Sequence, residues 1–323
     1  MRDETWDTLV FIGTEEQKLR LPAEYTIRCL RSYEEPAVIY GEGVDYGIDR
    51  AAGTIRRLPG SAVPDWRGHP HYGLEGFDHR ETSGYSNAPY TCILEYAEQP
   101  AAAVQPDPPA QLSLFTRLHA RLAAGEPVTY VAYGDSISAG YEASRPEAGY
   151  VMRLADTLRA RSSSGEVALD NRAKGGESSG GGLQRLRADV ASLAPDLVSI
   201  AYGMNDQNRQ PDGGNATPLA EFEGRLIDMV QTVREHTEAE VLLITPCLPN
   251  PRWALASANV RDYAEVIRRI GRELEVPVAD VQILWEQVLA EGKSHESLLL
   301  NNLNHPNDYG HALYLRAASK CTF

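Results

Sequence analysis

Residues 130–144 read "YVAYGDSISAGYEAS", and they join an apolar run directly to a small polar turn. An apolar run that stops at Gly134 is typical of a buried strand. Asp135 and Ser136 follow at once, which would place the hydroxyl of Ser136 at a strand-to-helix turn. A serine nucleophile is usually presented in this way. A serine that caps the next helix would give the same three residues, so the rest of the chain has to decide.

Helix-like and strand-like segments alternate over residues 112–323. The expected strands are 128–134, 166–173, 196–203, 240–246 and 276–281, and the expected helices are 112–125, 149–162, 182–195, 219–237, 259–275 and 309–318. This alternation predicts parallel βαβ units and an α/β domain with a doubly wound parallel sheet in three layers. Ligands bind at the carboxyl ends of the strands in such sheets, so polar residues there are candidate site residues.

Residues 1–100 show short β-like runs and no sustained helical periodicity. Residues 44–58, "VDYGIDRAAGTIRRL", predict a hairpin in which Gly53 supplies a positive φ. We expect a small antiparallel β-sandwich here, similar to a jelly roll. The segment "AEQPAAAVQPDPPAQ" is rich in Pro and Ala, which indicates a semi-rigid linker over residues 101–111. The second domain is then expected at 112–323.

The overall composition restricts the partners. The net charge of −14 argues against nucleic acids, polyphosphates and anionic membranes, and it fits a neutral polyhydroxylated substrate. No apolar run approaches the roughly 18 residues of a membrane helix. The start "MRDETWDTLVF" lacks a signal-peptide pattern, so we expect a cytoplasmic protein, with secretion left open if a leader was removed. The cysteines are scattered, so we expect free thiols and no metal site: Cys29, Cys92, Cys247 and Cys321.

Two further polar clusters follow expected strands. Gly176, in "DNRAKGGESSGG", would leave its backbone N–H open to a developing oxyanion, although a flexible surface loop explains the glycines as well. Asn205, in "GMND", would donate its side-chain amide to the same oxyanion. An Asx-turn is the alternative interpretation of Asn205.

The fourth cluster is "NNLNHPNDYGHALY" near the C-terminus. His305 precedes a proline, which favours a loop conformation, and histidine is the usual general base for a serine hydroxyl. His311 is the competing candidate. It lies at the start of the last expected helix, where a structural role is expected.

Together the four clusters resemble the sequence blocks of the SGNH subgroup of the GDSL hydrolases, over residues 125–315. Ser136, Gly176, Asn205 and His305 would be the four residues that give the subgroup its name. The resemblance implies a flavodoxin-like sheet and ester hydrolysis without a metal or an organic cofactor. His305 would take the proton of Ser136, and the backbone N–H groups of Ser136 and Gly176 would form the oxyanion hole with the side chain of Asn205.

One position departs from the family pattern, which usually has an aspartate three residues before the histidine. Here that residue is Asn302. An amide accepts a hydrogen bond from an imidazole, but it does not stabilise imidazolium as a carboxylate does. Three hypotheses follow: Asn302 orients His305, a backbone carbonyl does so, or another carboxylate such as Asp308 swings in. We favour a Ser–His dyad helped by Asn302 or a carbonyl.

Residues 61–80 crowd histidines and aromatic residues into one loop-like segment. Trp66 and Tyr72 are candidates for stacking on a sugar, although packing at a domain interface is more common for such residues. Asp135 is a third candidate substrate contact. The histidines His69, His71 and His79 lack any further metal-ligand pattern.

A β-sandwich before an SGNH domain resembles the layout of carbohydrate esterases. The first hypothesis is therefore a serine esterase that removes O-acetyl groups from a small or oligosaccharide ester. A short-chain carboxylesterase or lysophospholipase-like enzyme is the alternative within the class. A non-catalytic carbohydrate-binding protein is the alternative of another class, and Asn302 is the residue that favours it. The sequence leaves the oligomeric state open.

Overall fold

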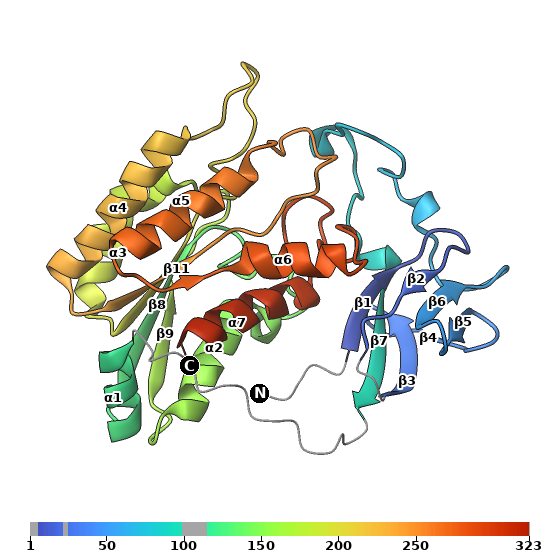
Figure 1. The fold of residues 1–323 in the computed structure, drawn as a ribbon, viewed down its shortest axis with the longest axis horizontal. Helices are drawn as coiled ribbons and strands as arrows, with labels where there is room; N and C mark the ends of the chain where they lie inside the picture. Colours follow the sequence, from blue (N-terminus) through green and yellow to red (C-terminus); the bar gives the residue numbers. More distant parts are fainter. Residues whose placement is uncertain (1–5, 22–24, 99–114, 323) are drawn as a thin grey trace.

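The structure is a computed structural model that describes residues 6–21, 25–98 and 115–322. In these ranges the chain forms a parallel sheet with helices on both faces and two antiparallel sheets near the N-terminus (Figure 1). This arrangement confirms the predicted fold class. The predicted linker, residues 101–111, lies outside the described residues, and the division into domains at 1–100 and 112–323 stays a prediction.

The parallel sheet has five strands in the order β12-β11-β10-β8-β9. They are β8 (Val128–Gly134), β9 (Val167–Asn171), β10 (Leu197–Ala201), β11 (Glu240–Ile244) and β12 (Val278–Ala279). Because β8 pairs with both β9 and β10, the chain moves to one side of β8 and then returns on the other. Such a reversal is the switch point where α/β sheets bind ligands. Ser136 follows β8 and Asn205 follows β10, so both flank it.

Alternate residues of β8 point into two cores, as expected for a strand buried on both faces. Tyr130 packs with residues of α1, α2, α6 and α7, whereas Val131 packs with residues of α3, α4 and α5. The helices are α1 (Thr116–Ala124), α2 (Tyr150–Arg161), α3 (Ser179–Val190), α4 (Leu219–His236), α5 (Val260–Glu273), α6 (Val281–Ala290) and α7 (Asp308–Thr322). Figure 1 shows the two groups on opposite sides of the sheet. The periodicity missed α6, which only Asp280 separates from the two-residue strand β12.

The N-terminal part contains a four-stranded sheet, β1-β7-β3-β4, and a three-stranded sheet, β2-β6-β5. The strands are β1 (Trp6–Val10), β2 (Gln17–Lys18), β3 (Tyr25–Ser32), β4 (Ile39–Tyr40), β5 (Tyr46–Asp49), β6 (Thr54–Arg57) and β7 (Thr91–Glu98). The predicted hairpin is β5 and β6, with Gly53 at φ 65° in its turn. Leu9, Leu30 and Ile55 belong to one core shared by the two sheets.

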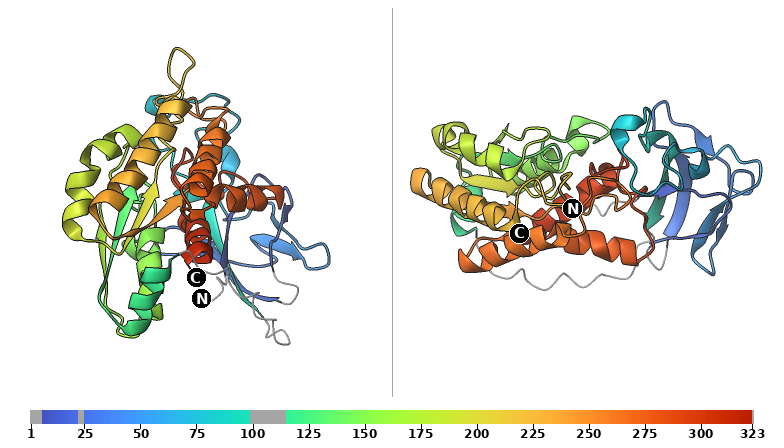
Figure 2. Two further views of the ribbon diagram at one scale, coloured as in Figure 1. Left: turned by 60° about the vertical axis from the view of Figure 1, so that its left-hand side comes forward. Right: turned by 90° about the horizontal axis from the view of Figure 1, so that it is seen from above.

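The two parts contact each other around the segment that leads into α7 (Figure 2). Residues between β6 and β7 form short 3-10 helices at Trp66–Gly68, His79–Glu81 and Ala88–Tyr90, and two others lie at Pro146–Ala148 and Ala191–Leu193. The Thr8 hydroxyl donates to the Ser297 carbonyl oxygen at 2.6 Å. The Asn87 backbone N–H donates to the Leu300 carbonyl oxygen at 2.6 Å. The N-terminal part therefore supports the loop that carries His305.

Candidate active site

Ser136 lies in the turn that follows β8 and is 3% exposed. The glycine that ends β8 is required by close packing, because a Cβ at Gly134 would lie 2.6 Å from the carbonyl oxygen of Ala201 in β10. The Oγ atom of Ser136 lies 2.8 Å from Nε2 of His305, a hydrogen-bond distance. The sequence candidates for nucleophile and base are therefore in contact, although 169 positions separate them in the chain.

The loop that carries His305 is built around one asparagine side chain. The Oδ1 atom of Asn301 accepts the backbone N–H groups of Leu303, Asn304 and His305 at 3.0, 3.0 and 2.9 Å. The loop then closes through a hydrogen bond from the Leu300 N–H to the His305 carbonyl oxygen at 2.9 Å. Sequence reasoning did not identify Asn301. The available signal was the tendency of asparagine to bind backbone groups a few residues on.

The candidate oxyanion-hole residues follow strands that are joined side by side. Gly134 of β8 pairs with Ala201 of β10, and its carbonyl oxygen accepts the N–H of Lys174 at 2.9 Å. Ser136 lies two residues beyond Gly134, Gly176 two beyond Lys174, and Asn205 four beyond Ala201. The same edge of the sheet thus carries Ser136 and both predicted oxyanion donors.

Gly176 and Asn205, the two oxyanion candidates besides Ser136, have different surroundings. Gly176 has φ 73°, and no atom lies within 4 Å of the position that a Cβ would take there, so the space beside its backbone is open. The Nδ2 atom of Asn205 donates one hydrogen to the carbonyl oxygen of Glu177 at 3.0 Å. An amide has two N–H donors, so one remains for another acceptor.

A buried carboxylate, missed by the sequence analysis, joins these two loops. Asp206 accepts the backbone N–H and the hydroxyl of Ser179, at 3.0 and 2.5 Å, and the N–H of Gly203 at 3.1 Å. The loop after β9 and the loop after β10 are therefore tied together behind the site. The Asp that follows Asn205 in the sequence was the available signal.

The expected contact between Asn302 and His305 is wrong. The side chain of Asn302 points into a buried amide cluster, where its Oδ1 accepts from Nδ2 of Asn250 at 2.9 Å and its Nδ2 lies 3.2 Å from Nδ1 of His71. Among the described residues, no group forms a hydrogen bond to Nδ1 of His305. The backbone of Asn302 is left-handed, with φ 58°, a conformation that asparagine tolerates.

Asp308, the alternative carboxylate, is also engaged elsewhere. Its two oxygens accept the backbone N–H and the hydroxyl of Ser144 at 2.8 and 2.6 Å. The predicted backbone carbonyl is likewise missing from Nδ1 of His305 within the described part of the chain. Asn302, a backbone carbonyl and Asp308 therefore do not support His305 in the structure, and of the three hypotheses only that of another carboxylate stays open.

His311 has the structural role expected of it. It is fully buried, and burial lowers its pKa to about 4, so the ring is neutral at physiological pH. Its Nδ1 accepts the N–H of Tyr150 at 3.4 Å, which leaves Nε2 to donate to the carbonyl oxygen of Tyr141 at 3.4 Å.

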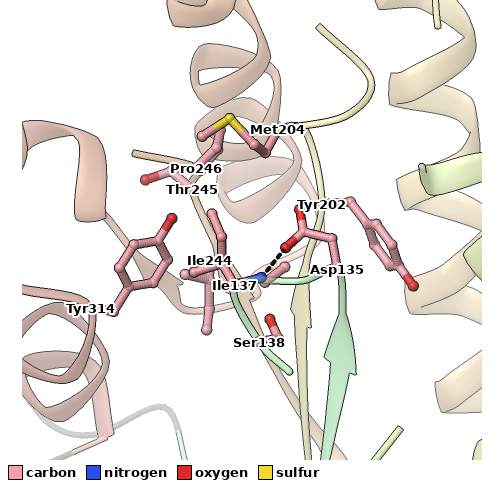
Figure 3. Close-up of a pocket in the computed structure, with 10 residues that line it drawn as sticks. Asp135, Ile137, Ser138, Tyr202, Met204, Ile244, Thr245, Pro246 and Tyr314 are labelled. Atoms are coloured by element: carbon pink, nitrogen blue, oxygen red, sulfur yellow. Dashed lines mark hydrogen bonds between the residues drawn. The ribbon is translucent and has the colours of Figure 1, made fainter. Parts of the chain in front are cut away.

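Two of the candidate substrate contacts, Trp66 and Asp135, have buried side chains, and their contact with a substrate stays a prediction. Trp66 is 2% exposed and stacks on His69, with ring centroids 3.7 Å apart. Asp135 accepts the Ile137 N–H at 3.0 Å and faces a cavity of about 10 Å³ inside the domain (Figure 3). Burial raises the pKa of Asp135 to about 7. Tyr72 is 41% exposed and remains an untested candidate.

The histidine-rich loop packs against the cluster around Asn302. His71 stacks on Phe77, with ring centroids 4.0 Å apart, and the indole N–H of Trp253 donates to Nδ1 of His79 at 3.1 Å. No group of three or more His, Cys, Asp or Glu residues suited to a metal ion occurs among the described residues. No described helix is long and apolar enough to span a bilayer.

Comparisons with known proteins place this site in a family. Residues 132–313, more than half of the chain, match the GDSL-like Lipase/Acylhydrolase family. A comparison with curated protein sequences found no match. Among solved structures, an acetylxylan esterase from Geobacillus stearothermophilus is 24% identical with a TM-score of 0.51, over 61% of this chain and 94% of that one. At this identity the likeness concerns the fold.

A second solved structure is an alpha/beta hydrolase enzyme from the metagenome of Lake Arreo, Spain. It is 26% identical with a TM-score of 0.50, over 62% of this chain and 99% of that one. Both structures thus match the parallel-sheet fold over most of their own lengths. The chain belongs to the GDSL-like lipase/acylhydrolase family and is a carboxylic ester hydrolase of the SGNH type.

Proposed function

We propose that the protein is a serine esterase that removes short acyl groups, above all O-acetyl groups from carbohydrates. The observation that carries this proposal is the 2.8 Å contact between Ser136 Oγ and His305 Nε2 at the switch point of the sheet. A serine hydroxyl is a weak nucleophile until a neighbouring base takes its proton, and this contact provides that base. Gly176 follows β9 and Asn205 follows β10, the two strands on either side of β8, and this placement supports the assignment of an oxyanion hole.

The reaction follows from this arrangement in two halves. His305 Nε2 accepts the proton of Ser136 as Oγ attacks the ester carbonyl carbon, and the carbonyl oxygen takes the negative charge. The N–H groups of Ser136 and Gly176 and the free N–H of Asn205 stabilise that charge. The intermediate collapses, the C–O bond to the alcohol breaks, and His305 returns the proton to the leaving alkoxide. Water, deprotonated by His305, then releases the acyl group as the acid and restores Ser136.

The proposed preference for acetyl groups on carbohydrates rests on the net charge and on the shared fold. The net charge of −14 disfavours anionic surfaces and suits a neutral polyhydroxylated substrate. The acetylxylan esterase from Geobacillus stearothermophilus shares the fold, which makes acetylated xylo-oligosaccharides a sensible first substrate. A preference for esters with longer acyl chains is the alternative, and the same chemistry would hydrolyse them.

The test measures hydrolysis of p-nitrophenyl acetate, butyrate and octanoate and release of acetate from acetylated xylo-oligosaccharides. The wild type is expected to prefer acetate esters, and Ser136→Ala to be inactive, because losing the nucleophile of a serine hydrolase costs roughly 10⁶-fold in kcat. Ser192→Ala is the matched control, since the Ser192 hydroxyl only donates to the Ala188 carbonyl oxygen in α3. Equal activity of Ser136→Ala and wild type would refute the mechanism. A preference for octanoate would refute the acetyl assignment alone.

A further inference from the structure

The imidazole of His305 lacks a hydrogen-bond partner on one side. Its Nε2 faces Ser136, but its Nδ1 is buried and forms no hydrogen bond within the described residues. In a serine hydrolase the group at Nδ1 holds the correct tautomer and stabilises the imidazolium that forms during catalysis. Neither Asn302 nor Asp308 provides that group here, because both side chains are engaged with other partners.

We propose that Glu142 is the positioning carboxylate of His305, an inference that rests on the proposed Ser–His mechanism. The Oε1 atom of Glu142 lies 4.0 Å from Nδ1 of His305, on the side of the ring away from Ser136. It is the only carboxylate oxygen within 4.0 Å of the His305 ring nitrogens in the described part of the chain. The imidazole therefore lies between the nucleophile and an acidic side chain that comes from the loop after β8.

The separation of 4.0 Å is longer than a direct hydrogen bond. Catalytic hydrogen bonds are commonly long without substrate and shorten in the reacting complex. Glu142 has three rotatable side-chain bonds, and its side chain is 35% exposed, so its carboxylate has room to move towards Nδ1. The ring of Tyr141 packs edge-on against His305, with centroids 5.7 Å apart, and fixes the plane of the imidazole.

The loop that carries Glu142 is attached to α7 on both sides of this residue. On one side, the neutral His311 of α7 donates to the carbonyl oxygen of Tyr141 at 3.4 Å. On the other side, Ser144 donates its N–H and its hydroxyl to Asp308 at the start of α7. Because α7 begins three residues after His305, these contacts hold Glu142 at a fixed position relative to the imidazole. They also explain why Asp308 is not free to serve His305.

The backbone of Glu142 is unusual as well. It has φ 64° and occupies the third position of a turn in which the Ala143 N–H donates to the Gly140 carbonyl oxygen at 3.2 Å. Turns with a positive φ at this position favour glycine or asparagine, because other side chains are strained there. Strained residues of this kind concentrate at functional sites. A glutamate in this place is therefore consistent with a requirement for its carboxylate.

The experiment compares four proteins: the wild type, Glu142→Gln, Glu142→Asp and the control Glu147→Gln. Glu147 lies on the same loop and is exposed, so its substitution removes the same charge without facing His305. We measure kcat, KM and the pH dependence of kcat/KM with p-nitrophenyl acetate, and thermal unfolding by circular dichroism. Ser136→Ala is measured beside them to establish the Ser–His mechanism independently.

Glu142→Gln is expected to lower kcat by about 10- to 100-fold at unchanged KM, less than the roughly 10⁴-fold of a fully buried triad aspartate, because Glu142 is partly exposed to water. The acidic limb of its kcat/KM profile is expected to move to lower pH, since a neighbouring carboxylate favours imidazolium. Glu142→Asp keeps the charge and should recover part of both effects. The other titratable neighbours, Asp308 and His311, are unchanged in every variant.

Two results would overturn the assignment of Glu142 while leaving the Ser–His mechanism intact. One is a wild-type kcat for Glu142→Gln when Ser136→Ala is inactive. The other is a lower kcat of Glu142→Gln that comes with a lower melting temperature and occurs equally in Glu147→Gln. In that case the acidic limb of the kcat/KM profile would not move. Absence of ester hydrolysis by the wild type would instead overturn the proposed function and the role of Glu142 with it.

Discussion

Replacement of Asn205 by alanine tests the oxyanion hole most directly. The Nδ2 atom of Asn205 has two hydrogens, and one of them is bound to the carbonyl oxygen of Glu177 at 3.0 Å. The remaining N–H is the proposed donor to the oxyanion. Alanine removes that donor and, with it, the tie to Glu177, whose peptide neighbour is the second proposed donor, Gly176.

The size of the effect follows from these two losses. Removing one oxyanion donor typically costs about 10²–10³ in kcat, or about 2.7–4 kcal/mol of transition-state stabilisation. The tie to Glu177 adds to this, because a looser peptide at that position lets the N–H of Gly176 move away from the developing charge. We therefore expect a loss near the upper end, about 10³ in kcat, with KM changed only slightly because the ground-state carbonyl is weakly bound.

The assay is steady-state hydrolysis of p-nitrophenyl acetate, with Asn215→Ala as the matched control. Asn215 makes a similar tie, since its Nδ2 donates to the carbonyl oxygen of Gln207 at 2.7 Å in the same loop, but it is not a proposed oxyanion donor. The control should lose stability and keep kcat within a few-fold of the wild type. Equal kcat losses in the two variants, or a kcat of Asn205→Ala within about fivefold of the wild type, would refute the assignment of Asn205.

Three other substitutions test close packing at the end of β8 and two buried charged groups. Gly134→Ala is expected to lower the free energy of unfolding by about 1–3 kcal/mol, measured by urea denaturation, and to lower kcat, because the new Cβ would meet the Ala201 carbonyl oxygen at 2.6 Å. Asp135, with its pKa raised to about 7 by burial, takes up a proton on folding at intermediate pH, so its contribution to stability falls as pH rises from about 4 to 7. The stability of Asp135→Asn relative to the wild type should therefore rise by about 3 kcal/mol between pH 5 and pH 8 in urea denaturation, and an equal difference at both pH values would contradict the assigned shift. Lys293→Met should cost about 3–5 kcal/mol by the same measurement, because the carboxylate of Asp7 would stay buried without its partner.

The parts of the fold that depend on local patterns could be predicted from the sequence. Apolar runs that end on glycine gave β8 and β10, and helical spacing gave the helix of residues 150–161 within a residue of its ends. Parallel strands align their carboxyl ends, so the polar residues after each strand were expected at one edge. This rule brought Ser136, Gly176 and Asn205 together, whereas the pairing of Ser136 with His305, which lies in the loop before α7, was implied by the family resemblance.

The contacts around His305 could not be predicted, because they depend on residues far apart in the chain. Asn302 approaches His71, which lies 231 positions earlier, and no local pattern links them. Glu142 occupies a strained turn position where glycine is the ordinary choice, so the sequence offered no sign that its side chain faces an imidazole. The spacing rule for the usual aspartate directed attention to Asn302, three residues from His305, and away from the loop that carries the serine.

The position of His305 is set by three independent attachments. Asn301 folds the loop locally, Asn302 and the backbone of Leu300 attach it to the N-terminal part, and Asp308 attaches it to the loop that carries Glu142. The bonds of Asn301 and Asn302 involve buried or partly buried groups, so losing one leaves an unpaired polar atom as well as a looser loop, whereas the bonds between Ser144 and Asp308 are exposed. In the proposed Ser–His dyad, where an asparagine occupies the position of the usual aspartate, such attachments would orient the imidazole. The same attachments hold the Glu142 carboxylate beside His305, from the loop that also presents Ser136.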